Sequence, residues 1–289
     1  MGLSFGTFWK LTRLEHSILT LVGVAVGWLL SYSSTTPLQF NVSLIVLLLT
    51  FGVGPALLTA GAFALNDYHG YETDKTNGRR DRPIVAGKIK LEVAKKIAYG
   101  LLVLGVLLSV PFGFNAILIS VLFVIGSLLY DPILKKLPLI GNIFIATTMA
   151  IPFVYGAVIA SSVVNNLVLI LTAIAILVGI GREILNTTRD IKGDRAIGAK
   201  TLPILIGANL SVKIASAFIL AAVLLSILPF MWTKSNTYLA VVAFCDALLI
   251  WAVLIANENP NDSTKLKTTR NYTLAALGVG LIAFLSLIL

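Results

Sequence analysis

The sequence predicts an all-α, polytopic membrane protein with nine transmembrane helices, folded as a single domain over residues 1–289. Three observations predict this class. The chain is 57% hydrophobic and only 12% charged, and its mean hydropathy is +0.94. Long uncharged runs recur along it, and lysine and arginine gather in every second segment between these runs. A single soluble core cannot bury so much apolar surface, so the bilayer must act as the solvent.

The uncharged runs place the helices in order. One crossing of the hydrocarbon core takes about 20 apolar residues, so several runs must contain two helices. Polar or proline-containing breaks divide them at 31–41, 111–115 and 161–166. The predicted spans are 15–33, 42–65, 92–110, 114–130, 138–160, 166–185, 209–230, 236–256 and 270–289. Cys245, the one cysteine, lies inside a span, which excludes a disulfide framework and a thiolate metal site.

Basic residues predict the orientation of these spans. Of 22 lysine and arginine residues, all but Lys234 fall on one side of the membrane if nine spans are right. The side rich in lysine and arginine is normally the cytoplasmic one. We therefore expect a multi-pass protein of the cell membrane with a cytoplasmic N-terminus, and with Leu289 outside. The net charge of +9 reflects this topology, and nucleic acid is not an expected partner.

A coarse internal repeat is also present. The second and sixth predicted spans each end in an acid-rich segment that is followed by basic residues. The fourth and eighth spans each lead into a short turn that carries lysine. Because the pattern recurs four spans later, the sequence predicts two pseudo-repeated four-helix halves and one appended helix.

The acidic residues gather in two segments at the ends of apolar runs. They are Asp67, Glu72, Asp74 and Asp81 in the first, and Asp131 with Glu183, Asp190 and Asp194 in the second. Asp67 and Asp74 are about two helical turns apart, and Asp190 and Asp194 about one, so each pair would share a helix face. Carboxylates this close repel each other unless a cation lies between them, and such hard oxygen donors suit Mg²⁺.

Basic residues are interleaved with these acids and are placed to bind phosphate oxygens, arginine with two parallel hydrogen bonds. They are Arg79, Arg80, Arg82, Arg189, Lys192 and Arg195. A solvated loop of mixed charge would explain one such segment equally well. Two matching segments in a chain so poor in charge favour a Mg²⁺ and phosphate site at a cytoplasmic membrane surface. The pattern predicts an enzyme that acts on a lipid diphosphate.

The same residues resemble the two signatures of the UbiA superfamily of intramembrane prenyltransferases. The first signature, N-D-x-x-D-x-x-x-D followed by R-P-I-x-x-G, is similar to residues 66–74 and 82–87. The second resembles residues 182–184, 190–194 and 198–203, and a short element between the fourth and fifth spans resembles residues 130–136. The resemblance covers nearly the whole chain and is strongest to the archaeal branch, the digeranylgeranylglyceryl phosphate synthases.

The resemblance implies Mg²⁺-dependent transfer of a geranylgeranyl group from geranylgeranyl diphosphate to the hydroxyl of geranylgeranylglyceryl phosphate, in archaeal membrane ether-lipid biosynthesis. It implies five catalytic residues: Asp67, Asp74, Asp190, Asp194 and Tyr130. The implied metal ligands are Asn66, Asp67, Glu72, Asp74, Asp190 and Asp194. The implied diphosphate- and phosphate-binding residues are Arg79, Arg80, Arg82, Lys135, Lys136, Arg189, Lys192, Arg195 and Lys200. Aromatic candidates to face the allylic cation are Phe63, Tyr68, Tyr71 and Tyr130.

Two positions depart from the family pattern. Gly70 occupies the position of the middle aspartate in the first signature, and Thr187 replaces an acid in the second. Glycine permits a positive φ, so we expect a bend at Gly70 that brings Glu72 or Asp74 inward as a substitute ligand. The alternative is that water fills the vacant coordination position and that Glu72 is a bystander.

Rival functions stay open at this point. The acceptor could instead be an aromatic quinone precursor or a tetrapyrrole. A secondary transporter would share the internal repeat and the basic loops, but it would place its acids near the membrane centre. Asp246 is the one acid near the middle of a predicted span, which makes it either a functional candidate or the partner in an interhelical hydrogen bond.

Overall fold

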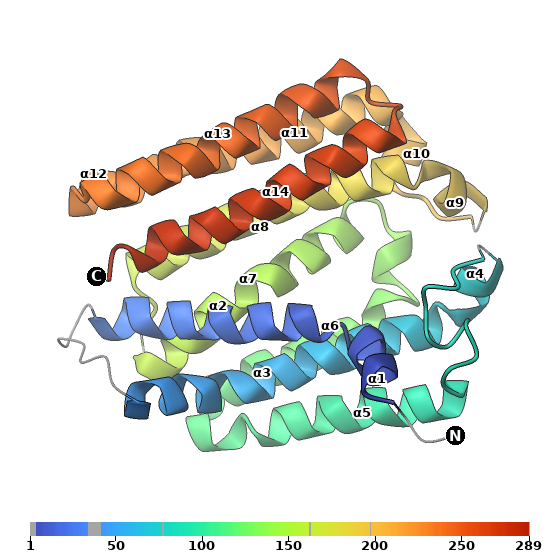
Figure 1. The fold of residues 1–289 in the computed structure, drawn as a ribbon, viewed down its shortest axis with the longest axis horizontal. Helices are drawn as coiled ribbons and strands as arrows, with labels where there is room; N and C mark the ends of the chain where they lie inside the picture. The colour runs from blue at the N-terminus through green and yellow to red at the C-terminus, as the bar shows by residue number, and fades with distance from the viewer. Residues whose placement is uncertain (1–3, 34–41, 77, 162, 197, 289) are drawn as a thin grey trace.

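The computed structural model describes residues 4–33, 42–76, 78–161, 163–196 and 198–288, whose only regular elements are helices (Figure 1). This confirms the all-α prediction. The α-helices are α1 (Phe5–Thr12), α2 (Leu14–Ser33), α3 (Val42–His69), α4 (Tyr71–Thr76), α5 (Leu91–Leu107), α6 (Phe114–Tyr130), α7 (Ile140–Ala160), α8 (Asn166–Arg189), α9 (Ile191–Ala196), α10 (Leu202–Ile206), α11 (Ala208–Leu225), α12 (Ile227–Thr233), α13 (Asn236–Glu258) and α14 (Ser263–Leu285). Short 3₁₀ helices, η1 (Val110–Phe112) and η2 (Leu134–Lys136), lie before and after α6.

Seven helical stretches of the described residues are long and apolar enough to cross a membrane. They are Leu14–Tyr32, Ser43–His69, Leu91–Phe112, Ile140–Ala160, Asn166–Arg189, Ala208–Thr233 and Asn236–Glu258. The chain is therefore an integral membrane protein. Helix α6 is apolar but only 17 residues long, and α14 begins with a polar stretch that contains Arg270. The predicted count of nine spans is not confirmed by length and hydropathy alone.

Several predicted helix ends are wrong. Helix α3 continues to His69 and α8 to Arg189, so both acidic motifs begin within helices and not in loops. Helix α14 begins at Ser263, because Asp262 Oδ1 caps it by accepting hydrogen bonds from the Thr264 and Lys265 amides at 2.8 and 3.2 Å. Hydrophobicity marks where a helix can leave the hydrocarbon core, whereas backbone hydrogen bonds and caps decide where it ends.

Helices α2 and α7 cross with their backbones in contact. A Cβ atom built on Gly27 would overlap the carbonyl group of Phe153, and one built on Gly156 would overlap the carbonyl of Val24. Glycine at both positions removes the side chains that would otherwise hold the two helices apart. This crossing fixes α2, which precedes the first acidic motif, against the helix that leads into α8.

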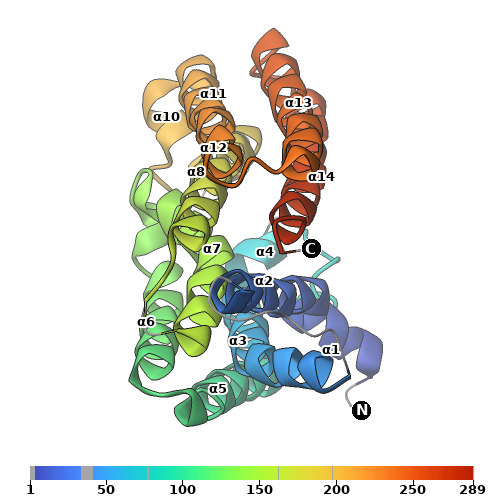
Figure 2. The same ribbon diagram turned by 90° about the vertical axis from the view of Figure 1, so that its left-hand side faces the viewer.

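The packing order repeats along the chain. Helix α2 packs against α3 and α3 against α5, and in the same order α7 packs against α8 and α8 against α11. The last helix, α14, packs against α13 and α8. Figure 2 shows α5 at one edge of the molecule and α13 at the opposite edge. The short helices α1, α4, α9 and α10 lie together at one end of the long helices (Figure 1).

Candidate active site

The first acidic motif continues the helix α3 into α4. The Gly70 amide donates to the Asn66 carbonyl and the Asp74 amide to the Gly70 carbonyl, both at 2.8 Å, so helical hydrogen bonding runs through the junction. Gly70 does not have a positive φ, and the expected bend there is wrong. Because the helix persists, Asp67 and Asp74 share one face, as their spacing predicts.

Arginine residues neutralise this face. Arg82 Nη1 lies 2.8 Å from Asp67 Oδ1, and Arg82 Nε lies 3.6 Å from Asp74 Oδ2, so one guanidinium bridges the two acids. Arg13 Nη2, at the end of α1, contacts the same Asp67 oxygen at 3.1 Å. Asp67 is only 2% exposed, and its second oxygen, Oδ2, is buried without a hydrogen-bond partner. Sequence reasoning missed Arg13 as a site residue, because it was counted only as a topological charge before the first span.

Asp131 is the centre of a second polar cluster beside the first. The Asn66 amide donates to both of its carboxylate oxygens, at 2.9 and 3.1 Å. Lys135 Nζ lies 3.7 Å and His69 Nδ1 3.9 Å from the same carboxylate. Burial raises the pKa of Asp131, and the Lys135 charge opposes that rise. Asp131 was not among the predicted ligands, although its position between Tyr130 and Lys135 was a usable signal.

The second acidic motif repeats the first one 120 residues later. Asn186, Asp190 and Asp194 stand where Asn66, Gly70 and Asp74 stand, and the same backbone hydrogen bonds form: the Asp190 amide donates to Asn186 and the Asp194 amide to Asp190, at 3.1 and 3.0 Å. The repeat continues through the next turn in four further pairs. They are Gly78 and Gly198, Pro83 and Pro203, Ile84 and Ile204, and Gly87 and Gly207.

The repeat explains both departures from the family pattern. The first motif has aspartate at 67 and glycine at 70, whereas the second has threonine at 187 and aspartate at 190. Each motif therefore keeps one acid in its first turn and one four residues after the helix junction, at Asp74 and Asp194. The two motifs are complementary variants of one structure.

The two motifs lie within electrostatic range of each other at the same end of the molecule. Arg79 interacts electrostatically with both Asp74 and Asp190, while its side chain makes two hydrogen bonds of 2.9 Å to Asp81. Those hydrogen bonds lower the pKa of Asp81 to about 2. Arg189 likewise donates two hydrogen bonds to the Asp190 carboxylate, at 2.9 and 2.7 Å.

Burial is the main influence on the pKa of Asp194. Desolvation, and next the charge of Asp190, raise the pKa of Asp194 to about 6, and Lys135 opposes the shift. Lys135 thus interacts electrostatically with both Asp131 and Asp194, one in each half of the chain. Glu183, which precedes Asp190 by about two helical turns, accepts a hydrogen bond of 3.0 Å from Asn186 Nδ2.

The remaining predicted residues are exposed. The structure places Glu72, Arg80, Lys136, Arg195 and Lys200 with solvent-accessible side chains near the two motifs. The side chain of Lys192 lies outside the described residues. Nowhere in the described ranges do three His, Cys, Asp or Glu side chains converge closely enough to hold one ion. An ion at this site would therefore complete its shell with water or substrate oxygens, as Mg²⁺ commonly does.

Aromatic rings near the motifs are in contact with basic residues. The Arg13 guanidinium lies 4.4 Å from the Phe63 ring centroid, and Lys95 Nζ lies 5.4 Å from that of Tyr68. Tyr130 differs, because its ring stacks on Phe144 with centroids 5.6 Å apart. Tyr130 also interacts electrostatically with acids of both halves, among them Asp194. Of the aromatic candidates, Tyr130 is thus the one that lies within electrostatic range of the second motif.

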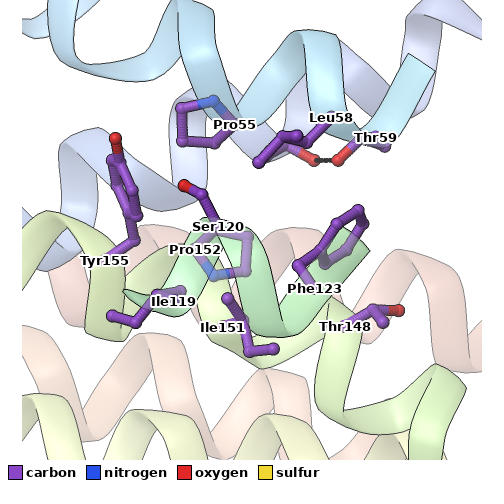
Figure 3. A pocket seen from close by; sticks show the side chains of 11 residues that line it. Pro55, Leu58, Thr59, Ile119, Ser120, Phe123, Thr148, Ile151, Pro152 and Tyr155 are labelled. Carbon is purple, nitrogen blue, oxygen red and sulfur yellow. Dashed lines mark hydrogen bonds between the residues drawn. The ribbon is translucent and has the colours of Figure 1, made fainter. Parts of the chain in front are cut away.

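An apolar pocket lies deeper in the protein, between α2, α3, α6 and α7 (Figure 3). The pocket is small, with a volume of about 20 Å³, which is room for little more than one water-sized group. Thr59 on its wall is eight residues before Asp67 on α3, which corresponds to about 12 Å along the helix axis. At its far end the Tyr155 hydroxyl donates to Ser109 Oγ at 2.9 Å. The pocket is thus a small apolar gap between the helices below the acidic motifs.

The fold and the site define a class: an integral membrane protein of long apolar helices with two matched acid–arginine motifs at one end. The model of the UbiA prenyltransferase family matches residues 19–287. The chain belongs to the UbiA prenyltransferase family, and it is a membrane prenyltransferase.

Relatives of known name agree with this assignment. The chain is 33% identical over 281 residues to a digeranylgeranylglyceryl phosphate synthase of Archaeoglobus fulgidus, which covers 96% of this chain and 93% of that one. It is 32% identical to the synthase of the same name from Methanoculleus marisnigri, over 86% of each chain. A solved structure of a digeranylgeranylglyceryl phosphate synthase superposes with a TM-score of 0.78 at 29% identity, covering 98% of both chains. A UbiA homologue of A. fulgidus bound to DMAPP and Mg²⁺ shares the fold, with a TM-score of 0.70 at 19% identity, covering 96% of this chain and 99% of that one.

Proposed function

We propose that this protein transfers a geranylgeranyl group from geranylgeranyl diphosphate to the hydroxyl of geranylgeranylglyceryl phosphate, a step of archaeal ether-lipid synthesis. The observation that carries the proposal is the pair of matched acidic motifs, 120 residues apart, that meet at one end of the long helices. The names of the archaeal relatives support the choice of donor and acceptor. The prenyl chain would lie between the long helices below the motifs, where the small apolar pocket between α2, α3, α6 and α7 marks a gap in the packing.

The donor set fits Mg²⁺. All candidate ligands offer hard oxygen atoms, and the buried Oδ2 of Asp67 has no hydrogen-bond partner of its own. The proposed ligands are Asn66, Asp67, Asp74, Asp190 and Asp194, whereas the sixth candidate, Glu72, is exposed and is proposed as a bystander. When bound, Mg²⁺ supplies charge neutralisation for the departing diphosphate. The A. fulgidus homologue with DMAPP and Mg²⁺ supports this choice of ion.

The residues of this chain would position and stabilise the reacting groups. The bond between C1 of the prenyl chain and the diphosphate oxygen breaks, and its electron pair leaves with the diphosphate. Arg79, Arg82 and Arg189 would stabilise that negative charge. Their guanidinium groups form salt bridges with Asp81, Asp67 and Asp190, at the end of the molecule where the diphosphate would bind. The acceptor hydroxyl oxygen then bonds to C1, and its proton passes to the released diphosphate or to water. Stacked on Phe144, Tyr130 would help to exclude water from the cation.

The proposal includes a topology. Helices α6 and α14 would join the seven long apolar stretches as spans, which gives nine. The N-terminus and both acidic motifs would then lie in the cytoplasm, with Leu289 outside, and residues 1–289 would form one domain of two pseudo-repeated four-helix halves with α14 appended. The alternation of basic residues and the repeated packing order support this arrangement.

One experiment tests the reaction directly. The purified protein in lipid nanodiscs is incubated with Mg²⁺, geranylgeranyl diphosphate and geranylgeranylglyceryl phosphate, and the extracted lipids are analysed by mass spectrometry. We expect digeranylgeranylglyceryl phosphate and an equal amount of released diphosphate. Transfer to an aromatic acid in a parallel reaction, with none to the glyceryl phosphate, would overturn the acceptor. No diphosphate release with any acceptor would overturn the reaction.

A further inference from the structure

Two further arginine residues lie outside the acid–arginine salt bridges described above. They are Arg182 on α8 and Arg270 on α14, and the two guanidinium groups interact electrostatically with each other. The Nε atom of each is buried and has no hydrogen-bond partner. In the part of the chain that the structure describes, neither forms a salt bridge, whereas Arg13, Arg79, Arg82 and Arg189 all do.

The neighbours of Arg182 do not satisfy its charge. Its one hydrogen bond goes from Nη1 to the Met149 sulfur at 3.9 Å, and a thioether is a weak acceptor. Glu183 interacts electrostatically with Arg182 but forms no salt bridge with it, and its carboxylate accepts a hydrogen bond from Asn186. Consecutive residues of an α-helix point about 100° apart, so Arg182 and Glu183 project from different sides of α8. His16 on α2 lies within electrostatic range of Arg182 and adds no negative charge.

Such a pair needs an anion. Two partly buried cations repel each other, and burial without a partner costs each of them hydration free energy. A phosphate group carries up to two negative charges and three acceptor oxygens, which match the donors of two guanidinium forks. The unpaired Nε atoms are the donors that such a group would bind.

The position separates this pair from the site of the donor diphosphate. Arg182 precedes Asp190 by eight residues, which places it about 12 Å further along α8 from the acidic motif. Helix α14 packs against both α8 and α2. The apolar pocket, in contrast, is lined by α2, α3, α6 and α7 (Figure 3). Helix α2 therefore borders both regions, and two lipid substrates could approach the acidic motifs along different sides of it.

We propose that Arg182 and Arg270 bind the phosphate of the lipid acceptor, and this inference rests on the proposed function above. Neither residue is among the phosphate-binding candidates implied by the family resemblance, which include Lys135, Lys136 and Lys200. Lys135 is already engaged with Asp131, and Lys136 and Lys200 are exposed. Phosphate bound between α8 and α14 would hold the acceptor at a fixed depth and direct its hydroxyl toward the prenyl donor.

Kinetics with each substrate varied in turn test the assignment. We expect Arg270→Gln and Arg182→Gln to raise the KM for geranylgeranylglyceryl phosphate at least about tenfold, the factor that corresponds to about 1.4 kcal/mol. The KM for geranylgeranyl diphosphate should stay within twofold, and Arg270→Lys should restore part of the loss. Lys267→Gln is the matched control, because it removes an exposed charge from the same helix one turn earlier. An equal rise in both KM values would overturn the assignment.

Equilibrium binding separates this inference from the reaction itself. Geranylgeranylglyceryl phosphate, the dephosphorylated geranylgeranylglycerol and inorganic phosphate are titrated against the protein in nanodiscs without the prenyl donor. We expect the phosphorylated lipid to bind the wild type at least tenfold more tightly than the alcohol, and Arg270→Gln to remove that difference. This result would support the phosphate site even if no prenyl transfer were found. An unchanged preference in the Arg270 variant, or inorganic phosphate competing as strongly as the lipid, would overturn the inference.

Discussion

Asp67 and Asp194 belong to matched motifs, yet the fold holds them in different ways. Asp67 is almost completely buried, and one of its oxygens receives contacts from both Arg13 and Arg82. Asp194 has no such partner among the described residues, and burial raises its pKa to about 6. Asp67 is therefore expected to stabilise the fold as well as the reaction, whereas Asp194 is expected to serve the reaction alone.

Asparagine substitutions distinguish these two roles. Asp194→Asn should lower turnover at least about 100-fold while the thermal unfolding midpoint stays unchanged, because it removes a charge that faces the leaving group. Asp67→Asn should lower turnover and also destabilise the protein by roughly 3–5 kcal/mol, because Arg13 loses its salt-bridge partner and Arg82 keeps only Asp74. Turnover and thermal unfolding of the detergent-purified variants check this. Glu258→Gln, at an exposed pair with Lys265, is the control. Wild-type turnover in Asp194→Asn would contradict its role.

The glycine at position 70 gives a prediction about Mg²⁺. Gly70 stands where Asp190 stands in the second half, and its φ is not positive, so an L-residue is compatible with its backbone. A Cβ there would lie 3.0 Å from the Asn66 carbonyl oxygen, which must shift slightly. We expect Gly70→Asp to keep activity and to lower the Mg²⁺ concentration at half-maximal turnover, because it adds an oxygen donor. Asp74→Ala should be nearly inactive, and chelation of Mg²⁺ should abolish turnover by the wild type.

Glu72→Ala is the matched comparison for the same titration. Its side chain is exposed, so we expect its Mg²⁺ dependence to follow the wild type. A higher Mg²⁺ requirement in this variant would show instead that Glu72 supplies the missing ligand. Activity of the wild type in excess chelator would contradict the metal requirement altogether.

At the scale of the elements, the sequence was most informative where spacing determines structure. The seven-residue interval from Asp67 to Asp74 predicted a shared face, and the helical hydrogen bonds through Gly70 confirm that face. The contacts of Arg13 with Asp67 and of Asn66 with Asp131 join residues 54 and 65 positions apart. Neither follows from local pattern, because the packing of distant helices brings these side chains together.

The crossing of α2 and α7 provides a stability prediction at this scale. Gly156→Ala would place a methyl group against the Val24 carbonyl, so the two helices must separate. We expect the free energy of unfolding to fall by about 3 kcal/mol, the upper part of the usual cost of overpacking, and the thermal unfolding midpoint to be lower. Gly100→Ala on α5 is the control, because nothing lies within 4 Å of its added Cβ. Equal midpoints for the two variants would contradict the close backbone contact.

At the scale of the whole molecule, the internal repeat and the distribution of basic residues predict the same topology. Matched motifs 120 residues apart face one end of the helices, so an even number of spans must separate them. Helix α1 lies at that end, and the last turn of α14 lies near the other (Figure 1). An odd total of spans is consistent with both facts, and α6 and α14 are the helices that bring the total from seven to nine.

Cysteine labelling in sealed cells tests this topology. In a Cys245→Ala background, single cysteines replace exposed lysines at the two ends, as Lys88→Cys beside the first motif and Lys234→Cys at the α12 end. A membrane-impermeant maleimide added from outside should label the Lys234 variant and reach the Lys88 variant only after the cells are opened, because the basic end faces the cytoplasm. Labelling of the Lys88 variant in intact cells would reverse the orientation. Equal labelling of both from outside would place the two positions on one face, which requires that the span count between them be even.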